Sequence, residues 1–187
     1  LTTTNEILQF DEIVIASGAW SKKLLAPLGY NLPIEAERGY SLDLPPCKKE
    51  HQLSRPVASA ERKFIMTPMR HGLRLAGTVE YAGLNKSANM KRADMLFKNA
   101  QHILTELPEY NPDDTKSSQK WMGHRPSMPD SLPVICQAPK HENIYLALGH
   151  QHLGLTQGAI TGKIIGQLIS KKETEIDIRP FSITRFN

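Results

Sequence analysis

The sequence predicts an α+β fold in which α/β elements occur at both ends of the chain, on either side of a mixed, largely antiparallel sheet. Residues 13–16 and 144–148 are apolar throughout, which is typical of strands buried on both faces, as in a parallel sheet. The strands expected between residues 34 and 124 alternate in polarity, as antiparallel strands with one wet face do. Two kinds of layer therefore interleave along the chain.

The composition is that of an ordinary globular protein. Of 187 residues, 40% are hydrophobic and 22% are charged, which suits one large domain or a domain and a piece of another. The net charge of +4 is modest and aromatic residues are few, which argues against a nucleic-acid partner. Cys47 and Cys136 are too few and too far apart for a disulfide framework, so a reducing compartment is expected.

The chain has no pattern of a signal peptide and no run of about eighteen apolar residues that would span a membrane. It opens on Leu1 rather than methionine and enters a buried-strand pattern almost at once. We therefore expect these residues to be a piece of a longer protein.

The first elements follow the order strand, glycine turn, helix. The pattern predicts a weak strand (6–10), a buried strand (13–16), a glycine turn (17–21) and a short helix (22–26). Ser17 or Ser21 is expected to cap this helix, and Pro27 with Gly29 ends it. Such an order is typical of an α/β layer, whose crevices bind ligands.

The middle of the chain predicts an antiparallel sheet and one helix. Its elements are an extended segment (33–44), a loop (45–55), a hairpin (63–68 and 73–79), a helix (90–107), a strand (118–124) and a proline-rich loop (125–133). If 33–44 is a strand, Arg38 and Tyr40 lie on the same side of it, together with Ile34, Ala36 and Leu42.

The last elements are two strands, at 134–136 and 144–148, and a helix that runs to Ile169. In this helix glycine returns every fourth residue, at 154, 158, 162 and 166. Each glycine costs about 0.5–1 kcal/mol of helix stability relative to alanine, so something must come close to that backbone. Close packing against a sheet and a planar or phosphorylated ligand at the helix N-terminus both remain open.

Few side chains suggest chemistry by themselves. Arg125 is either a surface arginine or a fork for a carboxylate, which arginine can hold through two parallel hydrogen bonds. Tyr40 and Arg38 either line a pocket for a small polar anion or are a core tyrosine and a snorkelling arginine. His150 and His152 lack a third ligand nearby, so no metal is expected.

Four segments in order resemble the C-terminal half of FAD-dependent amino-acid oxidoreductases. They are residues 13–21 (IVIASGAWS), 37–42 (ERGYSL), 123–133 (GHRPSMPDSLP) and 149–156 (GHQHLGLT). Within that group the chain is most similar to bacterial D-amino-acid dehydrogenases, relatives of glycine oxidase and D-amino-acid oxidase.

The resemblance implies a division into domains and a set of site residues. Residues 1–33 and 136–187 would be parts of an FAD-binding, Rossmann-like domain, and 34–135 would be the substrate-binding domain. The substrate would be bound by Arg125, which holds its carboxylate, and by Tyr40, Arg38 and His150. The cofactor-binding residues would be Gly18, Ala19, Trp20, Gly123, Gly149, His152, Leu153, Gly154, Leu155 and Thr156.

The implied reaction is oxidative deamination of a D-amino acid by hydride transfer from Cα to N5 of FAD, which gives a 2-oxo acid and ammonia. Because the flavin performs the electron chemistry, no acid–base pair of side chains is required. Open alternatives are a secondary amino acid (sarcosine, proline or hydroxyproline) as substrate, or a non-catalytic interaction domain of this fold. The electron acceptor, quinone or oxygen, stays open as well.

The resemblance also implies what these residues lack. The Gly-x-Gly-x-x-Gly turn that binds the pyrophosphate of FAD occurs nowhere in them, so the FAD site is incomplete. The chain alone is expected to bind FAD weakly or not at all and not to turn over. Covalent relatives attach flavin to a cysteine in a motif like residues 123–130, which contain none, so non-covalent FAD is expected. A cytoplasmic location is expected, with peripheral contact of the full-length enzyme with the inner membrane left open.

Overall fold

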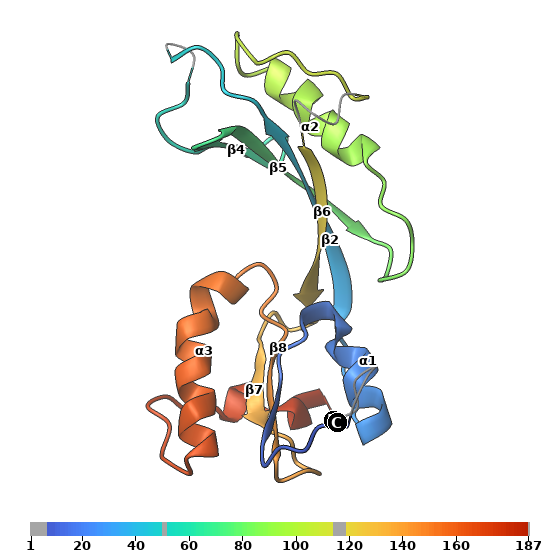
Figure 1. Cartoon of the computed structure of the whole chain (residues 1–187), viewed down its shortest axis with the longest axis vertical. Coiled ribbons are helices and arrows are strands. Elements are labelled where there is room, and N and C mark those ends of the chain that lie inside the picture. Colours follow the sequence, from blue (N-terminus) through green and yellow to red (C-terminus); the bar gives the residue numbers. More distant parts are fainter. Residues whose placement is uncertain (1–6, 50–51, 114–118, 187) are drawn as a thin grey trace. The chain divides into compact units, whose positions relative to one another are not determined.

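The computed structural model describes residues 7–49, 52–113 and 119–186 (Figure 1). They form two compact units, the first made of residues 1–36 and 125–187 and the second of residues 37–124. These units meet at residues 36/37 and, inside strand β6 (Gln119–Ser127), at residues 124/125, whereas the domain limits expected from the sequence are at residues 33 and 135. The assignment of a cofactor domain and a substrate domain stays a prediction.

The first unit is built on a three-stranded sheet. Its strands β1 (Ile13–Ile15), β8 (Ile144–Leu148) and β7 (Val134–Gln137) lie in the order β1-β8-β7. Strand β1 runs parallel to β8, and β7 runs antiparallel to it. All three strands were predicted from their apolar runs. The parallel pair joins the two ends of the chain in one layer.

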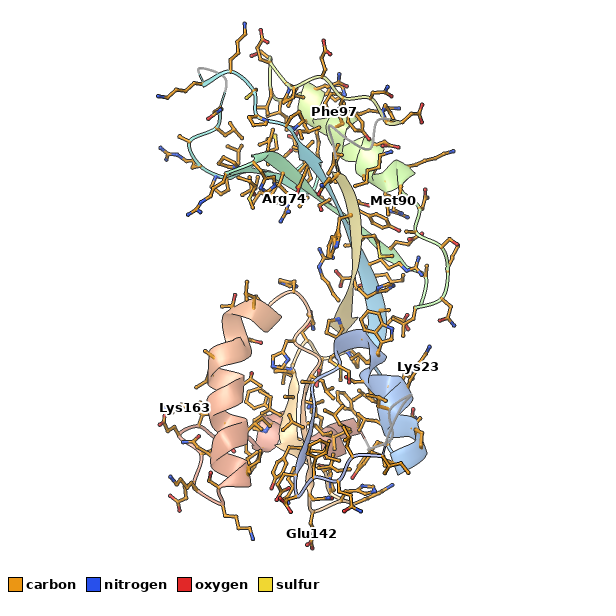
Figure 2. All side chains as sticks on the ribbon, viewed as in Figure 1. Lys23, Arg74, Met90, Phe97, Glu142 and Lys163 are labelled. Carbon is orange, nitrogen blue, oxygen red and sulfur yellow. The ribbon has the colours of Figure 1, made fainter. Side chains whose placement is uncertain are left out.

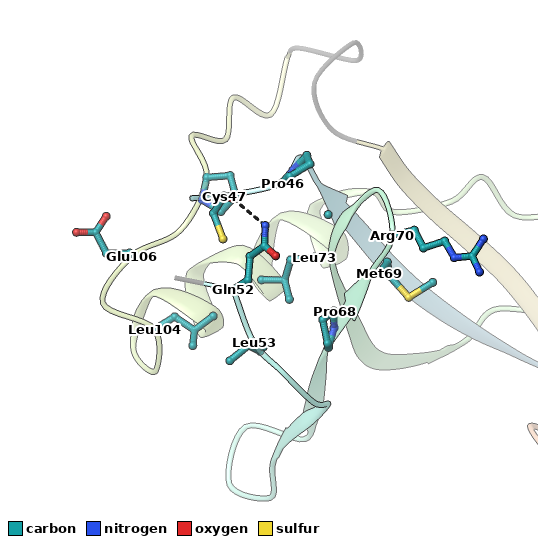
Figure 3. Close-up of a pocket in the computed structure, with 12 residues that line it drawn as sticks. Pro46, Cys47, Gln52, Leu53, Pro68, Met69, Arg70, Leu73, Leu104 and Glu106 are labelled. Carbon is teal, nitrogen blue, oxygen red and sulfur yellow. Dashed lines mark hydrogen bonds between the residues drawn. The ribbon is translucent and has the colours of Figure 1, made fainter. Parts of the chain in front are cut away.

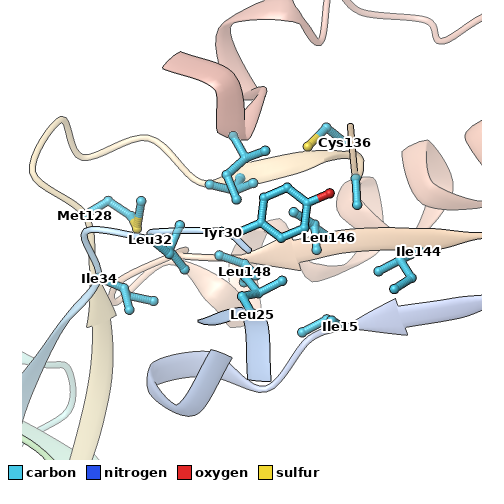
Figure 4. Close-up of a cluster of buried hydrophobic side chains, with 13 residues drawn as sticks. Ile15, Leu25, Tyr30, Leu32, Ile34, Met128, Cys136, Ile144, Leu146 and Leu148 are labelled. Carbon is cyan, nitrogen blue, oxygen red and sulfur yellow. The ribbon is translucent and has the colours of Figure 1, made fainter. Parts of the chain in front are cut away.

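Apolar side chains cover both faces of β7 and β8. On one face, Leu146 packs in a cluster with Leu25 of helix α1 (Ser21–Leu25) and Leu32 (Figure 4). On the other, Tyr145 packs against Ile164 of helix α3 (Gly154–Ile169). Helices α1 and α3 accordingly lie on opposite sides of the strands in Figure 1. The prediction of burial on both faces is wrong for β1, where Val14 is 42% exposed within this chain.

The turn after β1 is a 3₁₀ helix, η1 (Gly18–Trp20), and α1 follows it directly. The predicted caps are wrong, because Ser17 makes no capping bond and Ser21 is itself the first residue of α1, fully buried. A second 3₁₀ helix, η2 (Ala26–Leu28), ends at Gly29 in a left-handed conformation (φ 81°). The stop at Pro27 and Gly29 is therefore confirmed.

Helix α3 is confirmed, but its glycines do not pack closely against the sheet, which was one of the two explanations left open for them. Its buried residues are Thr161, Ile164 and Ile165, which face the sheet. Lys163 points away from the sheet in Figure 2 and forms an ion pair with Glu175 (Nζ–Oε1, 2.6 Å). The four glycines are exposed, so they are not there to let the helix approach this chain's own sheet. After α3 the chain ends in 3₁₀ helices η4 (Arg179–Phe181) and η5 (Ile183–Phe186).

The second unit contains most of a five-stranded sheet in the order β3-β4-β5-β2-β6. Its other strands are β2 (Glu35–Leu44), β3 (Val57–Ser59), β4 (Phe64–Met69) and β5 (Gly72–Tyr81). Pairs β4–β5 and β2–β5 are antiparallel, as predicted, and β3, a strand that the sequence did not predict, pairs antiparallel with β4. Helix α2 (Lys91–Gln101) packs through Ala93, Leu96 and Ala100 on the apolar face of this sheet.

Three predicted boundaries in the described residues are wrong. Helix α2 ends at Gln101 rather than at residue 107, because Leu104 and Leu107 pack against the same core from an irregular segment. Strand β6 continues to Ser127, since the order places it at a sheet edge, where Pro126 is tolerated. The weak strand at 6–10 reduces to a single bridge at Ile7, and its first residue lies outside the described residues, as does residue 118 of the predicted strand 118–124.

Candidate functional site

The parallel pairing of β1 with β8 brings two of the predicted cofactor segments to one edge of the sheet. Ile15 pairs with Leu146 and the two strands are parallel, so their carboxyl ends lie at the same edge of the sheet. The turn Gly18–Trp20 follows β1 and the segment 149–153 follows β8. Open α/β sheets bind ligands outside the carboxyl ends of parallel strands, where such turns meet.

The segment before α3 is a tight turn. Gly149 has φ 78° and Gln151 has φ 51°, both in the left-handed region that glycine adopts most readily. Any Cβ at Gly149 would lie 2.7 Å from the Cγ of Met128. Glycine is therefore required there both by the backbone and by the approach of the segment 125–128.

The predicted carboxylate-binding arginine lies in that neighbouring segment. The amide of Gln151 donates a hydrogen bond to the carbonyl of Pro126 (3.3 Å), the residue after Arg125. Arg125 itself is half-buried on β6. This hydrogen bond and the approach of Met128 to Gly149 both lie within the first unit. They hold the end of β6 next to the start of α3.

The N-terminus of α3 is open. Leucine at its N-cap, Leu153, has no polar side-chain atom to cap the first amides. Any Cβ at Gly154 would meet only the Cβ of His150, at 3.6 Å, and one at the glycines of 158, 162 and 166 would meet no other part of the described chain within 4 Å. Leu155 is fully exposed, while Leu153 is 43% exposed. The first amides of α3 and the positive end of its dipole are thus available to an acceptor.

The ring of His150 contacts the hydroxyl of Thr161 and is not placed to act as a base. One ring nitrogen lies 2.9 Å from the hydroxyl of Thr161, and burial lowers the pKa of the imidazole. It is therefore neutral at neutral pH. His152 is exposed on the same turn. Across the described ranges, no three His, Cys, Asp or Glu side chains are grouped so as to hold a metal ion.

The G-A-W turn has one buried and one half-exposed side chain. Ala19 is 4% exposed and packs inward, whereas Trp20 is 49% exposed. Gly18 has φ 55°, which turns the chain at the end of β1. The hydroxyl oxygen of the buried Ser21 has no hydrogen-bond partner among the described residues.

Tyr40 and Arg38 lie in the second unit and meet at one carboxylate that the sequence did not single out. Tyr40 donates a hydrogen bond to Oε2 of Glu80 (2.5 Å), and a guanidinium nitrogen of Arg38 lies 3.7 Å from the same oxygen. The hydrogen bond from Tyr40 is the main reason that the pKa of Glu80 is lowered. A bulge between Gly39 and Tyr40 shifts the register of β2 against β5 at this point.

Glu80 was missed because its role depends on register. It pairs with Arg38 across β2 and β5, forty-two residues apart in the sequence, and nothing local marks it. Gly123, also in this unit, is explained by packing, because the indole of Trp121 occupies the space that a Cβ would take. The predicted site residues therefore form two groups, one in each unit.

A small cavity lies elsewhere in the second unit. It has a volume of about 70 Å³ and is lined by Leu53, Pro68, Leu73 and Leu104, among others (Figure 3). Near it, the side-chain amide of Gln52 donates to the carbonyl of Cys47 (3.0 Å). None of the predicted site residues lines this cavity.

In the part of the chain that the structure describes, no helix is both long and apolar enough to cross a bilayer. This finding leaves the expected cytoplasmic location and the peripheral membrane contact as predictions.

Comparison with known proteins agrees with the resemblance stated from four segments. The family model described as FAD dependent oxidoreductase matches residues 1–168. The whole chain is 42% identical to a D-amino-acid oxidase and 32% identical to a D-amino acid dehydrogenase, both of Bradyrhizobium diazoefficiens. It spans 43% of the length of each of these relatives.

A solved structure agrees with the expected fold class. The crystal structure of glycine oxidase from Geobacillus kaustophilus matches with a TM-score of 0.76 and 27% identity, over 93% of this chain and 45% of that chain. The α+β fold class and the family resemblance are confirmed by these matches.

Proposed function

This chain belongs to the FAD-dependent oxidoreductase family, and from that premise we propose that the whole protein oxidises a D-amino acid to a 2-oxo acid and ammonia. The relatives at 42% and 32% identity are named a D-amino-acid oxidase and a D-amino acid dehydrogenase, which supports this substrate class. Because the chain spans less than half of each relative, the activity is assigned to the whole protein.

One observation carries the proposal: the hydrogen bond from the amide of Gln151 to the carbonyl of Pro126 (3.3 Å). It holds Arg125 beside the open start of α3. The backbone that carries Arg125 and the N-terminus of α3 are thus neighbours, and we propose that this arginine binds a carboxylate there while the helix N-terminus stabilises negative charge. This is the arrangement that an amino acid lying over a flavin requires.

The residues at the carboxyl edge of β1 and β8 fit the flavin of FAD. The open backbone at Gly154 and Gly158 leaves room for a flat ring, and the uncapped amides of α3 offer donors to its carbonyl oxygens. The flavin, when bound, accepts a hydride at N5. The start of α3 would stabilise the negative charge that results, together with Gly18–Trp20 and Gly149–Thr156 around the ring.

Arg125 would hold the substrate carboxylate through two parallel hydrogen bonds, which fixes Cα over the flavin. Tyr40 is proposed to line the substrate pocket, and His150, neutral and bonded to Thr161, to shape it without transferring a proton. Gly123 stays a proposed cofactor contact through its backbone alone, since the indole of Trp121 occupies the space that a side chain there would take. We assign no side chain the role of general base.

FAD binding by this chain alone is proposed to be weak or absent. The residues contain no Gly-x-Gly-x-x-Gly turn for the pyrophosphate, so only the flavin end of the site is represented. Attachment is proposed to be non-covalent, since Cys47 and Cys136 lie outside residues 123–130. Stoichiometric flavin in the purified 187-residue chain would contradict the first of these statements.

The test is a substrate screen on the whole protein. D-amino acids, their L-enantiomers, sarcosine, proline and hydroxyproline are supplied with either oxygen or an artificial quinone, and 2-oxo acid and ammonia are measured. The proposal predicts turnover of D-amino acids, and the better acceptor identifies oxidase or dehydrogenase chemistry. Turnover of secondary amino acids alone would favour that alternative, and flavin-free protein without turnover would favour an interaction domain.

A further inference from the structure

Arg38 is buried completely, and its guanidinium binds one loop. It is 0% exposed. Its Nε donates to the carbonyl of Gly83 (2.9 Å), Nη1 to that of Ser87 (3.3 Å), and Nη2 to those of Lys86 (2.5 Å) and Ala82 (3.4 Å). Four carbonyl oxygens of the loop 82–89, which joins β5 to α2, therefore surround a single cation.

Glu80 balances the charge and links Arg38 to Tyr40. Its side chain is 12% exposed and lies 3.7 Å from Nη1 of Arg38 and 3.8 Å from Nε of Arg92. Tyr40 donates to Glu80 (2.5 Å), and its hydroxyl oxygen accepts a hydrogen bond from the amide of Asn89 (3.1 Å). We call Arg38, Tyr40 and Glu80 the clasp. It holds the loop near its start, its middle and its end.

The clasp uses the donors that a substrate would need. A guanidinium has five N–H groups, of which four point at loop carbonyls, and Glu80 lies next to the same side chain. Binding a substrate anion would require these bonds to break inside a buried site, which is costly. Lysine could not replace Arg38, because one ammonium group cannot reach four carbonyls arranged around a planar fork.

We propose that Arg38 and Glu80 are positioning residues, which lock loop 82–89 and orient the Tyr40 hydroxyl, and that Arg38 does not touch the substrate. The role of the loop as a wall of the substrate pocket rests on the proposed function, through Tyr40. The locking of the loop does not, since it follows from contacts inside the second unit.

Trypsin digestion of the whole protein tests the lock without reference to activity. Cleavage after Lys86 needs its carbonyl, which Arg38 binds, so the exposed Lys86 should resist cleavage in the wild type. Arg38→Lys should speed cleavage there by about tenfold or more, because proteolysis follows the population of the open loop. Arg74→Lys is the matched control: Arg74 binds Asp43 on the same pair of strands and leaves the loop untouched, so cleavage after Lys86 should stay at the wild-type rate.

Equal cleavage after Lys86 in the wild type and Arg38→Lys would overturn the lock, as would an equal increase in Arg74→Lys. If Arg38→Lys does not fold, Tyr40→Phe replaces it, because this change removes only the hydroxyl that accepts from Asn89. Hydrogen exchange of the Asn89 amide should then rise by about tenfold, and an unchanged rate would overturn the proposal.

Kinetics separates positioning from a purely structural role. In Arg38→Lys the KM for a D-amino acid should rise by about tenfold while kcat changes by less than about threefold, since the loop shapes binding rather than the reacting atoms. An open loop with unchanged KM would overturn the positioning role and leave the proposed function standing. Wild-type protein without turnover of any amino acid would contradict the proposed function, whereas the digestion would still test the lock.

Discussion

Replacing Gly158 and Gly162 by alanine should stabilise this 187-residue chain. Both positions lie inside α3, and a Cβ at either would meet no other part of the described chain within 4 Å. Nothing then opposes the gain in helix propensity, which is about 0.5–1 kcal/mol for each glycine, or about 1–2 kcal/mol for the pair. For a chain of this size the melting temperature should rise by about 2–4 °C per kcal/mol.

Gly149→Ala is the matched control, because the same change meets the opposite conditions. Gly149 has φ 78°, and a Cβ there would lie 2.7 Å from Met128. The variant should lose about 1–3 kcal/mol from backbone strain and overlap. Chemical denaturation of the 187-residue chain measures all three proteins side by side.

In the whole protein, the same two alanine substitutions should be unfavourable, because they should weaken flavin binding. If a flavin and further chain lie against α3, added methyl groups remove that close approach, and flavin affinity should fall. Destabilisation of the 187-residue chain by Gly158→Ala would refute the open face. Unchanged flavin affinity in the whole protein, with the stability gain retained, would refute the reason given for the glycines.

Three further outcomes follow from burial and charge. Leu146→Ala in the core of the first unit should cost about 2–5 kcal/mol of unfolding free energy by denaturation, because Leu146 is 0% exposed; a cost below 1 kcal/mol would contradict the packing. Asp43→Asn should lower the free energy of unfolding by no more than about 1 kcal/mol, since the partner Arg74 is 41% exposed to solvent. A decrease several times larger would mean that the ion pair is less solvated than its exposure indicates. Because burial lowers the pKa of His150, the unfolded chain binds a proton at this residue below pH 6.5 that the folded chain does not, and the wild type should lose stability as the pH falls. In His150→Asn this loss should be smaller. Stability that rises as the pH falls through that range would contradict the sign.

Local patterns in the sequence were sufficient for the elements that are covered on both faces. The apolar runs of β7 and β8 and the period of α3 predict them correctly, because apolar side chains pack against both faces of these two strands. Val14 of β1 is exposed in this chain, although its strand has the same pattern.

Where the prediction failed, tertiary contacts decided the outcome. Leu104 and Leu107 continue the helical spacing of apolar residues in α2, yet they reach the same core from an irregular segment. The spacing therefore indicated which residues are buried, but not that they are helical. Ser21 matched the pattern of a cap but lies one position too late and is buried. Glu80 could not be found at all, since its pairing with Arg38 depends on a strand register that no local pattern encodes.

Arg125 is central to the proposed function as the group that would hold the substrate carboxylate next to a flavin at the start of α3. The direct measurement is KM for a D-amino acid in the whole protein carrying Arg125→Leu, with flavin content determined on the same sample and Arg179→Leu, an exposed arginine, as control. We predict full flavin content and a KM raised by about a hundredfold or more, as expected when a charged hydrogen-bonded pair is lost, with the control unchanged. Wild-type KM in Arg125→Leu, with flavin retained, would contradict it.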